Sequence, residues 1–272
     1  MATISLLSAK GSPGVTTTTV ALTLAWSRAH PGRAGLMVDA APIGGDCAAG
    51  VVLRGAAPAT AGVLPLATAR DLDSQAALDA ASVDLRADGS ARIVPGVPDE
   101  ARAAALPLAW DIVAEVRADL HHHGRDVLVD AGRVDRAGLA APWLADSDLA
   151  VLLLRPSLAA VLAAHRFGAQ WPLSGVPLHV LVVDAPSPYR GVEVADAVGA
   201  PLAGVIAFDA AAARVHSEGA APGRGFERSG YARTVHRTAV DVGALALARA
   251  DAHLPARDVD VAVPVSFGGA DG

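Results

Sequence analysis

Lys10 is the only lysine among 272 residues, although the chain contains 22 lysine and arginine residues in total. It lies in the segment 8–17, between an apolar run that ends at Leu7 and a helix-like segment that starts at Thr16. A glycine-containing loop between a strand and a helix start presents successive backbone N–H groups that bind a phosphate. A compact ammonium suits a point-charge contact with that anion. The alternative is a solvent-exposed loop lysine without a ligand.

The elements that must position this loop follow an alternating pattern along the chain. The pattern predicts an α/β fold, with a mostly parallel, doubly wound sheet flanked by helices on both faces. Residues 48–98 are rich in Ala, Pro and Gly, which predicts an irregular insertion with one or two short helices. We expect a single domain over 1–255 that contains this insertion, followed by a flexible tail over 256–272. The expected strands are 4–7, 35–39, 92–94, 126–130, 149–154, 178–183 and 202–208, and the expected helices are 16–29, 100–122, 158–170, 192–198 and 231–250.

Aspartates stand at or just after the ends of four expected strands. They are Asp39, Asp130, Asp184 and Asp209. In open parallel sheets, ligands bind outside the carboxyl ends of the strands, so this edge is the expected functional edge. For Asp39 and Asp130 the alternative is a local role, in which each carboxylate caps a helix or forms a turn.

Composition excludes several classes of protein. The net charge of −6 and pI of about 5.8 do not favour a nucleic-acid partner. Five scattered arginines form either a local basic patch for a nucleic acid or an ordinary solvated face. The longest apolar stretches are interrupted, and neither a signal peptide nor a membrane anchor is expected, so we expect a cytoplasmic protein. A single cysteine, Cys47, excludes an internal disulfide and a multi-cysteine zinc site. The five scattered arginines of the possible basic patch are Arg214, Arg224, Arg228, Arg233 and Arg237.

Three consecutive histidines, His121 to His123, invite a metal interpretation. Successive side chains on a helix point about 100° apart and do not converge on one ion. The following Gly124 instead predicts that these histidines end a helix, where cationic side chains are favourable. We expect Trp26, Trp110, Trp143 and Trp171 to pack in the core or between helices.

The loop also resembles the deviant Walker A sequence, K-G-G-x-G-K-T-T, of the MinD/ParA family of P-loop ATPases. Here residues 10–17 read Lys-Gly-Ser-Pro-Gly-Val-Thr-Thr, which matches the signature lysine, both glycines and both threonines. Residues 38–46 are similar to the family's D-x-D-P strand and glycine turn, and 127–132 to its Walker B strand. Residues 150–156 and 201–209 are similar to its late strands and nucleotide-base loop. The pattern resembles most an actinobacterial branch of MinD-like, septum-site and pilus-assembly proteins.

Two departures from the family's pattern bear on activity. Val15 stands where the family has the lysine that lies against the β- and γ-phosphates, and a lost charge-assisted hydrogen bond weakens binding about ten- to hundredfold. Lys10 is expected to compensate, because the family's signature lysine reaches a phosphate across a dimer. Ala41 replaces the second aspartate of D-x-D-P, whose role is to orient the attacking water. We expect these two departures to impair the hydrolysis of ATP more than its binding.

The resemblance implies roles for the remaining residues. Lys10 and Asp39 would be catalytic, and Thr16, Asp39 and Asp130 would hold Mg²⁺, whereas the alternative for Thr16 is an ordinary residue at a helix start. ATP or ADP would contact Lys10, Gly11, Ser12, Pro13, Gly14, Val15, Thr16, Thr17 and Asp209.

The first functional hypothesis is a MinD/ParA-like protein with weak or absent ATP hydrolysis. It would act as a dimerising switch that positions or regulates a protein partner in division, segregation, secretion or pilus assembly. The alternative is a pseudo-ATPase scaffold that binds no nucleotide. A third hypothesis, a ligase on the same fold resembling dethiobiotin synthetase, lacks a cluster of substrate-binding polar residues.

Overall fold

The computed structural model describes residues 1–11, 13–42, 60–69, 73–97, 99–134, 141–171, 175–184 and 188–253 of the chain. Ser12, Cys47 and the expected tail 256–272 lie outside the described residues, as do the side chains of 251–253.

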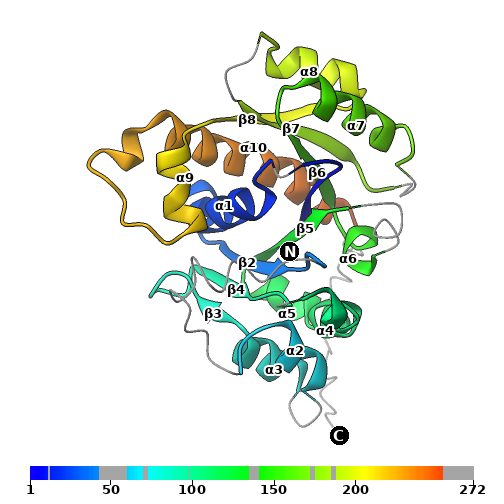
Figure 1. The fold of residues 1–272 in the computed structure, drawn as a ribbon. Coiled ribbons are helices and arrows are strands. Elements are labelled where there is room, and N and C mark those ends of the chain that lie inside the picture. The colour runs from blue at the N-terminus through cyan, green and yellow to red at the C-terminus, as the bar shows by residue number, and fades with distance from the viewer. Residues whose placement is uncertain are drawn as a thin grey trace, which may run out of the picture.

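A single sheet of eight strands forms the centre of the molecule (Figure 1). Its order is β3-β4-β2-β5-β1-β6-β7-β8, and every neighbouring pair is parallel except β3 and β4. The predicted fold class is therefore confirmed. The strands are β1 Thr3–Ser8, β2 Ala34–Asp39, β3 Val83–Asp84, β4 Ala91–Val94, β5 Arg125–Arg133, β6 Leu149–Leu154, β7 Leu178–Asp184 and β8 Leu202–Ala207.

Helices cover both faces of the sheet, as the buried apolar runs of its central strands require. On one face α1 (Val15–Ala29), α9 (Ala210–Ser217) and α10 (Gly230–His253) pack over one apolar cluster. The other face carries a second cluster beneath the remaining helices (Figure 1). These are α2 Val63–Thr68, α3 Ser74–Ala81, α4 Ala105–Glu115, α5 Arg117–His122, α6 Pro142–Ala145, α7 Leu158–Gly168 and α8 Gly191–Val198, with short 3₁₀ turns η2 Glu100–Arg102 and η4 Phe226–Arg228 elsewhere.

The structure confirms all seven strands and the helices expected near 16–29, 158–170, 192–198 and 231–250. The long helix expected over 100–122 is wrong as a single element, because it divides into η2, α4 and α5, with a break at Val116. The described part of 48–98 contains two short helices and the antiparallel edge pair β3–β4. His121 and His122 do end a helix, α5, and Gly124 follows with φ 63°. No described helix combines the length and apolar character needed to cross a bilayer.

The tryptophans pack as expected. Trp26, Trp110 and Trp143 are buried, and Trp171 is partly buried against the core. The Trp26 indole N–H donates to Asp126, which also accepts the backbone N–H of Ala2 and two bonds from Arg33. The buried Asp126 carboxylate thereby ties the first strand to α1 and to the loop that precedes β2.

An aromatic cluster holds α9 against the start of α10. The buried His216 Nδ1 lies 2.9 Å from the hydroxyl of Tyr231, and the Phe226 ring stands edge-on to His216. Burial, together with the positive charge of Arg86, lowers the pKa of His216 to about 4, and burial raises the pKa of Tyr231. The folded protein therefore disfavours the charged form of this histidine.

This pKa shift predicts a loss of stability in acid. In the unfolded state this histidine titrates near pH 6.5, so as pH falls the unfolded state binds a proton before the folded state does. The contribution of His216 to the free energy of unfolding is therefore full above about pH 6.5 and declines toward pH 4. Between pH 7.5 and 5 we expect the His216 contribution to fall by about 2 kcal/mol. Urea unfolding of wild type and His216→Gln measures it, since carboxylates titrate alike in both. Equal pH dependence in the two proteins would contradict the assignment.

Candidate functional site

The loop after β1 contains two glycines in the left-handed backbone region and leads directly into α1. Gly11 and Gly14 have φ of 74° and 97°, in the left-handed region that favours glycine, and Gly14 is the N-cap of α1. The first N–H groups of α1 have no intrahelical acceptor, and the helix dipole favours an anion at this end. Lys10 is exposed and forms no hydrogen bond or ion pair with the described residues. The loop can therefore receive an anion, and the Lys10 ammonium remains available.

Val15 does not face the loop. Its side chain is 6% exposed and belongs to the apolar cluster between α1, α10 and the sheet. The residue at the position of the family's phosphate-binding lysine has thus become part of the core.

Asp39 and Asp130 lie side by side at the carboxyl ends of β2 and β5. They are register partners, and adjacent strands are about 4.8 Å apart. Side chains alternate along a strand, so Asp130 shares a face with Leu128, which packs in the cluster beneath α1. Both residues therefore lie at the edge of the sheet that was expected to be functional, next to one another.

Each of the two aspartates also forms a local turn. Oδ1 of Asp39 accepts the Ala41 N–H at 3.3 Å, and Oδ1 of Asp130 accepts the Gly132 N–H at 2.9 Å. Bonds from residue i to i+2 are those of Asx turns, so the structural alternative considered for both residues is present. The turn uses only Oδ1 of Asp130, and Oδ2 takes no part in it.

Burial dominates the electrostatics of Asp130. The residue is 0% exposed, and desolvation raises its pKa to about 6, although the Thr16 hydroxyl and the Gly132 N–H both lower it. Thr16 therefore lies beside this carboxyl, yet Oδ2 is buried without a hydrogen-bond partner among the described residues. A buried, unsatisfied carboxylate oxygen is costly unless a cation or a donor completes it.

These residues fit a magnesium ion. Mg²⁺ is bound through one or two carboxylates with waters and phosphate oxygens, so a full set of protein ligands is not required. Thr16, Asp39 and Asp130 offer a hydroxyl and two carboxylates, and Asp130 Oδ2 is an unpaired acceptor. No group of three His, Cys, Asp or Glu side chains with a metal-ligand arrangement occurs in the described part of the chain.

Ala41 presents only a methyl group to this edge. It is 4% exposed, and a Cβ at Gly132, whose φ is 60°, would lie 2.8 Å from the Ala41 Cβ. The two residues are therefore in close apposition, and the position offers nothing that orients a water.

Asp209 and Asp184 lie apart from this centre. Asp209 is exposed and caps α9, since its carboxylate accepts the Ala212 N–H at 2.9 Å. It follows β8, which is separated from β1 by β6 and β7. Asp184 ends β7 and is also exposed. Pro13 is buried and Thr17 partly buried, whereas Ser12 lies outside the described residues.

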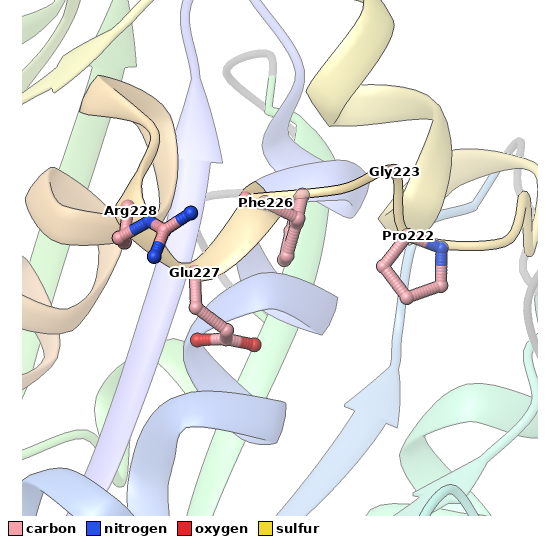
Figure 2. Close-up of a pocket in the computed structure, with 6 residues that line it drawn as sticks. Pro222, Gly223, Phe226, Glu227 and Arg228 are labelled. Carbon is pink, nitrogen blue, oxygen red and sulfur yellow. The ribbon is translucent and has the colours of Figure 1, made fainter.

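Two hollows occur elsewhere on the described surface. One, of about 370 Å³, lies in the loop between α9 and α10 and is lined by Phe226, Glu227, Arg228 and their neighbours (Figure 2). The other, of about 810 Å³, lies among α2, α3 and α4, and its lining includes Gly96 but no charged side chain. Neither is lined by a residue predicted to bind nucleotide, and the second has no charge for a phosphate.

Comparison with solved structures identifies the fold. MinD from Pyrococcus horikoshii complexed with Mg-ADP superposes with a TM-score of 0.69 at 20% identity, covering 91% of this chain and 98% of that one. A ParA family ATPase from Chlorobium tepidum gives 0.68 at 19% identity, over 88% and 98% of the two chains. The chain has the fold of the MinD and ParA ATPases. MinD in the MinC:MinD cell division complex of Aquifex aeolicus gives 0.67 at 19% identity, over 90% and 96%.

No protein-family model and no curated protein matches the sequence. At identities of 20% or below, the MinD/ParA likeness is one of fold. Function is therefore inferred from the loop, Thr16, Asp39 and Asp130 of this chain.

Sequence reasoning missed one residue of this site, Gly96, and included Gly132 only as the last residue of the segment 127–132. Gly132 donates to Asp130 and approaches Ala41, and a signal for it was present, because it closes the Asp-Ala-Gly sequence after an apolar strand. Gly96 lies against Asp39 although 57 positions separate them in sequence, so no local pattern indicated that contact.

Proposed function

We propose that this protein binds ATP or ADP with Mg²⁺ weakly, and that its nucleotide state drives homodimerisation. The observation that carries the proposal is the placement of the glycine loop, Thr16 and the Asp39–Asp130 pair at one sheet edge. The unpaired Oδ2 of Asp130 supports the metal, and the Mg-ADP of the Pyrococcus horikoshii MinD structure agrees with both ligands.

The proposed roles follow from the chemistry of each group. Backbone N–H groups at the start of α1 hold the phosphates, and Thr16, Asp39 and Asp130 hold Mg²⁺, which when bound neutralises phosphate charge. Lys10 supplies its ammonium to a nucleotide in the partner copy. Hydrolysis is slow or absent, because Ala41 has no polar atom with which to orient a water.

The dimer is proposed to position or regulate a protein partner in division, segregation, secretion or pilus assembly. The MinC:MinD complex supports a protein partner in general. We assign this role to one domain over 1–255, because strands from 3–8 to 202–207 share one sheet.

A scaffold that binds no nucleotide is the second candidate. Two observations favour it: Val15 is packed in the core, and Ala41 is packed against Gly132. Both positions have lost the polar chemistry that the resemblance would require.

Calorimetry with Mg²⁺ and ATP decides between the candidates. We expect a Kd in the micromolar range or weaker, because Val15 contributes no charge. Val15→Lys should tighten binding about tenfold or more, since a charge-assisted hydrogen bond is worth roughly 1.5–3 kcal/mol and the stem can bend out of the core. Val15→Met is the matched control, with similar length and no charge.

No binding up to millimolar ATP would favour the scaffold. Equal affinities for Val15→Lys and Val15→Met would show that the loop does not cradle a phosphate at this position.

A further inference from the structure

We infer that Gly96 is a positioning residue that fixes the carboxylate of Asp39 for the metal. A Cβ on Gly96 would lie 2.6 Å from Cγ of Asp39 and 2.7 and 2.9 Å from its two oxygens. These three atoms are its nearest neighbours, and unstrained contacts between carbon atoms are near 3.5–4.0 Å. The carboxylate thus occupies the space that any other residue at position 96 would fill.

The requirement for glycine at this position comes from the contact and not from the backbone. The φ of Gly96 lies outside the left-handed region, so alanine can adopt this backbone conformation. Gly11 and Gly14 differ, because their positive φ alone favours glycine. A methyl group at position 96 therefore acts on Asp39 specifically.

The backbone around Gly96 has little freedom to move aside. The carbonyl of Pro95 accepts the Val63 N–H at 2.8 Å, and Val97 is fully buried. On the other side, Asp39 is held by the Ala41 N–H and is 1% exposed. With both partners restrained, the clash has to be relieved by rotation of the Asp39 side chain or by a strained contact.

Rotation of Asp39 would move its carboxylate relative to Asp130, its register partner on β5. Mg²⁺ demands near-ideal octahedral geometry, so a small displacement of one carboxylate weakens the site. This inference rests on the proposed function, in which Asp39 and Asp130 hold the ion. Gly96 is assigned no ligand role of its own, and it acts through Asp39.

The test uses Gly96→Ala, Asp39→Ala, the double variant and Gly223→Ala in the full chain. Gly223 is the matched control, because its φ is also not left-handed and nothing lies within 4 Å of a Cβ there. Gly96→Ala should lower Tm by roughly 3–6 °C, but by less than about 1 °C in the Asp39→Ala background, where the clash is absent. Gly223→Ala should leave Tm unchanged.

The second readout is ATP binding with magnesium and with EDTA. We expect Gly96→Ala to lose about tenfold in affinity for Mg·ATP while its affinity for metal-free ATP is unchanged, a split that general destabilisation does not produce. Additive Tm shifts, or a full magnesium effect in Gly96→Ala, would overturn the inference. If wild type binds no nucleotide, the proposed function fails, and the Tm cycle alone decides whether Gly96 positions Asp39. A Gly96→Ala protein that folds only with Asp39→Ala added would support the coupling.

Discussion

Replacing Lys10 with alanine should abolish nucleotide-dependent dimerisation and leave the folded monomer intact. Lys10 is exposed, and it has no hydrogen bond or ion pair with the described residues of its own chain, so its ammonium is available to a phosphate in a second copy. An exposed loop side chain contributes within about 0.5 kcal/mol to stability. Sedimentation with and without Mg²⁺ and ATP measures the effect.

Lys10→Arg should restore dimerisation only in part, because a planar guanidinium replaces a compact ammonium poorly in a tight loop. Arg166→Ala removes an equal charge from the exposed surface of the last turn of α7 and should dimerise as wild type does. Undiminished dimerisation of Lys10→Ala would remove the support for a nucleotide-driven switch.

The largest loss of stability is expected at Asp126, outside the functional site. Its fully buried carboxylate accepts bonds from Ala2, Trp26 and Arg33. Asp126→Asn keeps the shape of the side chain but removes its charge and with it the ion pair to Arg33, whose side chain is 22% exposed. Breaking a buried pair in this way costs about 3–5 kcal/mol. Urea unfolding at neutral pH measures the change.

The control is Glu227→Ala, which breaks the ion pair between Arg28 and Glu227. The side chains of Arg28 and Glu227 are 66% and 71% exposed. Exposed pairs contribute up to about 1 kcal/mol. A similar small loss for Asp126→Asn would mean that the network does not anchor β1.

Seven of the eight strands were predictable, because the central strands β1 and β6 are fully buried and read as continuous apolar runs. The placement of Asp39 and Asp130 at one edge followed from the rule that ligands bind at the carboxyl ends of parallel strands, whereas their adjacency comes from the pairing of β2 with β5. The short helices were not predictable in detail: α2 has six residues and contains Pro65, and α3 has eight. Segments of that length show too little periodicity to distinguish a helix from a loop. The break at Val116 has no glycine or proline to mark it.

Two features of the site depend on contacts that sequence does not encode locally. The burial of Val15 is set by α10 and the sheet, and the Gly96–Asp39 contact joins residues far apart in the chain. Asp209 has a local contact instead, because its carboxylate caps α9, and its contact with a nucleotide stays a prediction. An aspartate before an alanine run is an N-cap signal, and the structure shows this local role.

The central claim is that the loop, Thr16 and the two aspartates form a site for nucleotide and magnesium together. The most direct test is calorimetric titration of wild type and Asp130→Asn with ATP, in magnesium and in EDTA. The account predicts that EDTA weakens binding to wild type at least about tenfold, and that Asp130→Asn binds ATP equally in both conditions, because the cation's acceptor is lost. ATP affinity that is the same with and without magnesium in wild type would contradict it.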